Sequence, residues 1–164
     1  GGSSVPILPA NLLLKTAKGE TRMMTYESLS DGGFATGSMM GSGGFIVLDE
    51  DQCVVRNTMT LARFYRHESC GQCSPCREGT GWMEKILLNI DNGKGKMSDI
   101  DLLWDIQRKI EGNTICPLGD AAAWPVASAI RHFRHEFEAY VNHPNQQHEV
   151  SYYDHCHNLV SAEV

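Results

Sequence analysis

One stretch of the sequence predicts how the rest of the chain is organised: Ser69-Cys70-Gly71-Gln72-Cys73-Ser74-Pro75-Cys76-Arg77-Glu78-Gly79. Its three cysteines are two residues apart, so one tight loop can present three thiolates to a single compact object. A fourth cysteine, Cys116, lies much further along the chain and is followed directly by a proline. Bacterial ferredoxins use three such cysteines and a distant Cys-Pro as cubane ligands. We therefore predict one four-iron four-sulfur (4Fe-4S) cluster held by Cys70, Cys73, Cys76 and Cys116.

Three neighbours of the cysteines are expected to surround this cluster. Gly71 and Gly79 lack a side chain, so the backbone there can come close to the cluster. Arg77 places a positive charge beside an anionic group. The loop amides, and the N-terminus of a helix that starts at about Cys76, can point their N–H groups at the sulfurs. Such hydrogen bonds stabilise the cluster and raise its reduction potential.

A structural zinc ion is the alternative, because zinc also takes four cysteine ligands. Zinc modules usually pair their cysteines in two Cys-x-x-Cys units, whereas a three-plus-one set favours a cubane. The zinc interpretation would make the chain an interaction module without redox chemistry. The other two cysteines are weaker candidates. Cys53 has the surroundings of a small buried hydrophobic residue, and Cys156 lies in a histidine-rich segment without a scaffold for a metal site.

The hydrophobic pattern becomes helical after residue 56. Apolar residues recur at helical spacing in four segments separated by short loops, which predicts a four-helix bundle over residues 57–141. The predicted helices run from Asn57 or Thr58 to Glu68, from about Cys76 to Asn92, from Ser98 to Gly112, and from Trp124-Pro125 to about 141. Residues 142–164 are expected to form a loosely attached tail.

Residues 1–56 have a different pattern, in which short apolar runs alternate with glycine, serine and aspartate. Glycines are too frequent there for a long helix. The run Phe45-Ile-Val-Leu48, closed by an acidic turn, is the best strand candidate. These features predict a small β-rich domain, so the expected fold class is α+β.

Composition excludes several classes of function. The chain has 164 residues, a net charge of −6 and no basic block such as nucleic-acid binding requires. It shows no apolar run of membrane-spanning length and no secretory leader. We find no nucleophile–base pair and no phosphate-cradling glycine motif, so no catalytic residue is predicted. The expected role is the transfer of single electrons.

Three segments closely resemble one known family: His67–Gly79 with the cysteines, Glu111–Asp120 around Cys116, and Ala123–Val126. They are similar to the NADH-binding flavoprotein subunit of respiratory complex I, the NADH:quinone oxidoreductase (NADH dehydrogenase). Met40–Asp49 looks like the small β-grasp domain of that flavoprotein. The resemblance covers about residues 1–141 and implies a β-grasp (ubiquitin-like) domain over residues 1–56.

The resemblance also implies cofactors and partners. In this family a glycine-rich domain binds FMN and NADH; it would precede residue 1, so the chain looks like the C-terminal part of the flavoprotein. NADH reduces FMN, which passes electrons singly to the cluster and on toward the quinone. The implied partners are the rest of the flavoprotein, a ferredoxin-like 2Fe-2S subunit and the large iron–sulfur subunit. The implied location is peripheral, on the cytoplasmic side of a bacterial inner membrane or the matrix side of a mitochondrial one. A related alternative is the equivalent subunit of an NAD-reducing hydrogenase or formate dehydrogenase.

Overall fold

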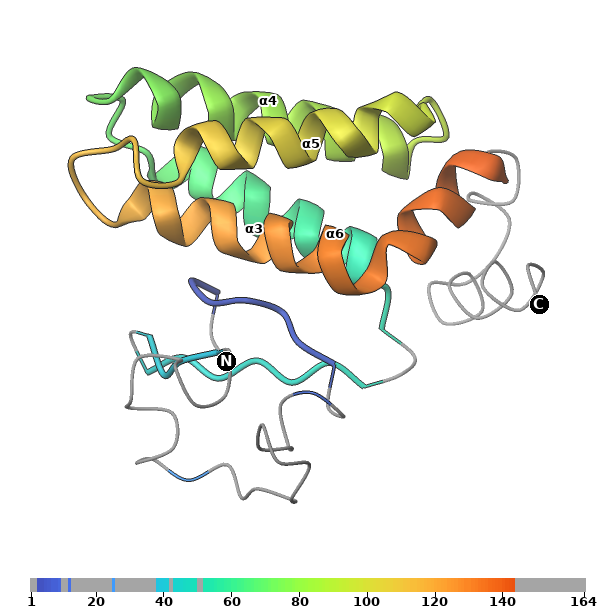
Figure 1. The fold of residues 1–164 in the computed structure, drawn as a ribbon, viewed down its shortest axis with the longest axis horizontal. Helices are drawn as coiled ribbons and strands as arrows, with labels where there is room; N and C mark the ends of the chain where they lie inside the picture. The colour runs from blue at the N-terminus through green and yellow to red at the C-terminus, as the bar shows by residue number, and fades with distance from the viewer. Residues whose placement is uncertain are drawn as a thin grey trace.

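Four α-helices make up most of the structure. The computed structural model describes residues 3–9, 12, 25, 38–41, 43–49 and 52–143. Within them the helices are α3 (Val54–Glu68), α4 (Ser74–Asp91), α5 (Met97–Ile110) and α6 (Leu118–Asn142) (Figure 1). The four predicted helices are therefore present. Their starts differ from the predicted ones, most of all for α6, which begins six residues before Trp124.

The predicted α+β class is wrong, because the described residues form helices and no strand. The strand candidate Phe45–Leu48 is a non-helical segment whose side chains are largely exposed, with Val47 75% accessible. An apolar, β-branched run becomes a strand only when a neighbouring segment pairs with its backbone and covers its side chains. No described segment does either, so the structure gives no support to a β-grasp domain over residues 1–56. Much of that region lies outside the described residues, and so do residues 144–164 of the tail predicted over 142–164. Asn142, the first residue of that predicted tail, is instead the last residue of α6.

The core lies between the four helices. Helix α3 packs against α4 and α6, and α5 packs against the same two helices. Each of α4, α5 and α6 contributes to the largest fully buried side chains, which include Tyr140, Phe137, Met83, Leu87, Ile90, Ile100, Leu103 and Ile110. Burial of such side chains stabilises a fold by about 1.5–3 kcal/mol each. This packing fixes the helix ends that carry the cysteine loops.

The up-and-down order of the helices brings two loops together. Residues 69–73 connect α3 to α4, and residues 111–117 connect α5 to α6. Because each helix reverses the direction of the previous one, both loops lie at the same end of the bundle, on the left in Figure 1. The cysteines of these two loops, which are far apart in the sequence, therefore lie at the same end of the bundle.

The N-terminal segment 3–9 lies against the bundle. Ile7 donates its backbone N–H to Ser128 Oγ of α6 at 2.7 Å, and the Tyr65 hydroxyl of α3 donates to Ser4 Oγ at 2.9 Å. Val5 is 1% exposed between these contacts. This segment therefore covers a face formed by α3 and α6.

Candidate iron–sulfur site

The four predicted ligand cysteines lie in or next to the two loops at this end. Cys70 is exposed in the α3–α4 loop, Cys73 is the half-buried N-cap of α4, and Cys76 is 7% exposed in the first turn of α4. Cys116 is exposed in the α5–α6 loop. None of the four is in a disulfide. The set therefore includes one sulfur against the core and others open to the surface.

One hydrogen bond joins the two loops. The backbone N–H of Ile115, the residue before Cys116, donates to Cys73 Sγ at 3.4 Å. The fourth cysteine is thereby held on the loop that faces the other three. Amide donors of this kind are what the cysteine motif predicts around the sulfurs.

The α5–α6 loop is fixed by its own contacts. Gly112 donates its N–H to Asp120 Oδ1 at 2.7 Å, and Thr114 Oγ1 donates to the carbonyl of Cys116 at 2.9 Å. A Cβ on Gly119 would lie 2.3 Å from Thr114 Oγ1, so only glycine allows this close packing. The backbone of Cys116 is therefore well determined although its side chain is exposed.

The residues predicted to surround the cluster shape the α3–α4 loop and its support. Gly71 has a φ of +78°, a conformation that favours glycine. Arg77 Nη1 donates to the Gly71 carbonyl at 2.8 Å, and its Nε donates to Glu78 Oε1 at 2.9 Å. Gly79 lies where a Cβ would be 2.6 Å from Ile110 Cδ1 of α5. Arg77 thus fastens the loop, and Gly79 sets the distance between α4 and α5.

One side chain at the site is not predicted by the sequence pattern. Ser69 Oγ lies 3.2 Å from Cys76 Sγ, and it accepts the backbone N–H of Gly71 at 3.3 Å. The only signal in the sequence is its position directly before the first cysteine. The contact itself depends on how α3 and α4 are placed.

The donor set fits an iron–sulfur cluster, which proteins hold through four cysteine thiolates. The four cysteines lie on two adjoining loops and in the first turn of α4, and a backbone N–H and a hydroxyl lie at hydrogen-bonding distance of two of the sulfurs. Within the described part of the chain, no three His, Cys, Asp or Glu side chains converge closely enough for one metal ion. A cubane is larger than one ion, so its ligands surround a wider space.

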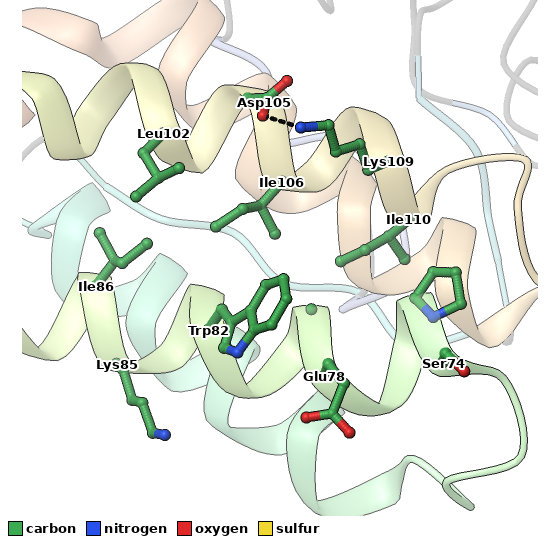
Figure 2. A pocket seen from close by; sticks show the side chains of 12 residues that line it. Ser74, Glu78, Trp82, Lys85, Ile86, Leu102, Asp105, Ile106, Lys109 and Ile110 are labelled. Atoms are coloured by element: carbon green, nitrogen blue, oxygen red, sulfur yellow. Dashed lines mark hydrogen bonds and ion pairs between the residues drawn. The ribbon is translucent and has the colours of Figure 1, made fainter.

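A groove runs from the cysteine loop along α4 and α5. It has a volume of about 590 Å³ and begins at Ser74 and Pro75, beside the cysteines. Figure 2 shows Trp82 and Ile86 of α4 facing Leu102 and Ile106 of α5 across the groove, with the Asp105–Lys109 ion pair at the rim. Trp82 is 53% exposed. The surface beside the cysteine loop is therefore mainly apolar.

A helical bundle that carries four cysteines at one end is the architecture expected of an iron–sulfur-binding module. The family described as the NADH-ubiquinone oxidoreductase-F iron-sulfur binding region matches residues 56–140. The chain belongs to this family, which confirms the resemblance drawn from the sequence.

Curated relatives agree with this assignment. The chain is 49% identical over 139 residues to the NADH-quinone oxidoreductase F subunit of Rickettsia bellii (strain OSU 85-389), covering 85% of this chain and 31% of that protein. It is 48% identical to the F subunit of Rickettsia conorii (strain ATCC VR-613 / Malish 7), and the match covers 85% of this chain and 30% of that protein. The chain thus spans about a third of the length of these relatives.

A solved structure shares the fold. The crystal structure of an NAD+-reducing nickel–iron hydrogenase in the H2-reduced state matches with a TM-score of 0.64 and 30% identity, covering 86% of this chain and 22% of that chain.

Among the described residues, no helix has the length and apolar character needed to cross a membrane.

Proposed function

We propose that this chain holds one 4Fe-4S cluster through Cys70, Cys73, Cys76 and Cys116 and relays single electrons as part of an NADH-quinone oxidoreductase F subunit. The hydrogen bond from Ile115 N–H to Cys73 Sγ carries the proposal, because it brings the loop of the fourth cysteine onto the loop of the other three. Membership of the family supports the iron–sulfur character of the site.

Each part of the site has a physical task in this proposal. A bound cluster supplies a one-electron carrier. The cysteine thiolates hold it, and N–H groups at the start of α4 stabilise negative charge on the sulfurs. Arg77 keeps the loop in shape through the Gly71 carbonyl. The packed helices would limit rearrangement of the ligands between the two oxidation states of a bound cluster.

The rest of the pathway would lie outside these residues. We infer that FMN and NADH bind in the preceding part of the flavoprotein, and that electrons leave toward the quinone through the large iron–sulfur subunit, with the ferredoxin-like 2Fe-2S subunit attached. The complex would lie peripherally on the cytoplasmic face of a bacterial inner membrane or the matrix face of a mitochondrial one. The relatives are named as subunits of NADH-quinone oxidoreductase, which supports the proposal that the chain works within such a complex.

Metal content separates this function from the zinc alternative. Anaerobically purified chain should contain iron and acid-labile sulfide in equal amounts and give an EPR signal on reduction. Stoichiometric zinc, without iron, sulfide or a reducible signal, would show that the chain is a structural module.

The ligand assignment predicts a specific loss in one variant. Cys116→Ser replaces the only cysteine of the α5–α6 loop, so the visible absorption and EPR signal of the cluster should be lost or strongly altered. Cys156→Ser and Cys53→Ser are the matched controls, and both should retain the wild-type spectrum. An unaltered cluster in Cys116→Ser would mean that the fourth ligand is another residue.

The equivalent subunit of an NAD-reducing hydrogenase is the second candidate, which the 30% identical solved structure favours. The 49% identity to an F subunit makes the quinone enzyme the better assignment. Activity assays of the native complex distinguish the two candidates. Hydrogen-dependent reduction of NAD+, without NADH–quinone activity, would favour the hydrogenase.

A further inference from the structure

Ser69 connects the end of α3 to a sulfur at the start of α4. Its backbone N–H donates to the Tyr65 carbonyl at 3.0 Å and closes the last turn of α3. Its hydroxyl oxygen lies 3.2 Å from Cys76 Sγ, and Cys76 is only 7% exposed. Water is therefore largely kept from this sulfur.

The direction of the hydrogen bond follows from the chemistry of the two groups. A serine hydroxyl has one proton to donate and two lone pairs. The backbone N–H of Gly71 occupies one lone pair of Ser69 Oγ at 3.3 Å. A cysteine that ligates iron is a thiolate and has no proton. The Ser69 hydroxyl must therefore be the donor when Cys76 is a ligand.

We propose that Ser69 is a positioning residue that raises the reduction potential of the cluster through Cys76. This inference rests on the proposed function. Adding an electron increases the negative charge shared by cluster and thiolates, so a donated hydrogen bond stabilises the reduced form more than the oxidised form. At a buried sulfur, water does not replace a lost donor.

The test is an EPR-monitored redox titration of the cluster-loaded full chain. Ser69→Ala should shift the reduction equilibrium three- to tenfold toward the oxidised form, where tenfold corresponds to about 59 mV for one electron. Ser69→Thr keeps the hydroxyl and should titrate like the wild type. Ser69→Val has the shape of threonine without the hydroxyl and should titrate like the alanine variant.

A neighbouring serine provides the control. Ser74 is exposed, and its hydroxyl accepts a long contact of 3.4 Å from Arg77 Nη2 rather than lying at a sulfur. Ser74→Ala should leave the potential unchanged.

Two outcomes would overturn the proposal. One is a wild-type potential in Ser69→Ala or Ser69→Val. The other is a chain that loses the cluster without the hydroxyl and keeps it in Ser69→Thr, because Ser69 would then be needed to hold the cluster and not to set its potential. Failure of the proposed function is distinguishable, since the wild-type chain itself would then lack iron or a reducible signal.

Discussion

At the scale of single residues, Glu136 is the described carboxyl group whose pKa the fold changes most. Burial raises its pKa to about 7, although it accepts a hydrogen bond from the Val54 N–H at 3.2 Å, which acts in the opposite direction. The reference pKa is 4.5. Between pH 4.5 and about 7, Glu136 is protonated in the folded chain but has lost its proton in the unfolded chain. The free energy of unfolding therefore falls as the pH rises through this window and levels off above about 7.

Replacing this carboxyl with an amide should remove the pH dependence. Glu136→Gln keeps an oxygen that can accept the Val54 N–H but carries no charge. We expect the variant to be more stable than wild type near pH 8, by up to about 3 kcal/mol, and similar to it near pH 4. Urea unfolding followed by circular dichroism measures both values. An equal difference at both pH values would contradict the assigned role of burial.

The cysteines also differ as single residues, in how far reagents can reach them. Cys70 and Cys116 are exposed, Cys73 is half-buried, and Cys76 and Cys53 are buried. Because alkylation requires an accessible thiolate, iron-free chain should be modified first at Cys70 and Cys116, then at Cys73, and last at Cys76 and Cys53. Mass spectrometry after timed iodoacetamide treatment gives this order. Rapid modification of Cys76 would show that the start of α4 is open.

At the scale of elements, two glycines of α4, Gly79 and Gly81, differ in whether a side chain would fit there. A Cβ on Gly79 would lie 2.6 Å from Ile110 Cδ1 and 2.7 Å from its Cγ1, and Ile110 is 1% exposed. A Cβ on Gly81 would meet only Arg66, at 3.8 Å, which is an ordinary contact. Gly79 thus permits the approach of α4 and α5, whereas Gly81 does not take part in it.

The two alanine variants should change stability in opposite directions. Gly79→Ala should destabilise the chain by about 1–3 kcal/mol through overpacking. Gly81→Ala should stabilise it by about 0.5–1 kcal/mol through helix propensity alone. Chemical unfolding of both variants tests the pair, with Gly81→Ala as the control for the substitution itself. Stabilisation by both would mean that Ile110 moves aside freely.

Helix boundaries show what local sequence rules can predict. A proline suits the first turn of a helix, and Pro75 does lie in the first turn of α4. The same preference misplaced the start of α6 at Pro125, which lies inside a helix that begins at Leu118. Proline in a helix costs one hydrogen bond, and the buried residues before it, Gly119 and Ala122 among them, offset this by packing. Such packing is not visible in a local pattern.

The cysteine spacing predicts a ligand loop because that information is local, and the ligand set itself stays a prediction. Cysteine spacing carries no information about contacts between separate segments. Neither the Ile115–Cys73 hydrogen bond nor the Ser69–Cys76 contact could therefore be predicted. The strand prediction for Phe45–Leu48 failed for the same reason, since its composition is that of a strand and its described surroundings contain no pairing partner.

At the scale of the whole molecule, the bundle separates Glu136 from the cysteine loops. The cysteine loops lie where α3 ends, and Glu136 contacts the residue where α3 begins. The length of a helix therefore separates the partly buried carboxyl of Glu136 from the sulfurs. This separation is why Glu136→Gln is expected to alter stability while leaving the spectrum of the cluster unchanged.

The contact between Ile115 and Cys73 has a further consequence, for the entropy of the chain. It joins positions 42 residues apart. A cluster held there would act as a cross-link that closes a loop of about 40 residues and restricts the unfolded chain, an effect of about 4 kcal/mol in the loop-closure model. Chain loaded with iron should therefore unfold at a higher urea concentration than chain stripped by a chelator. Cys116→Ser, which leaves the remaining ligands within residues 70–76, should lose most of that difference.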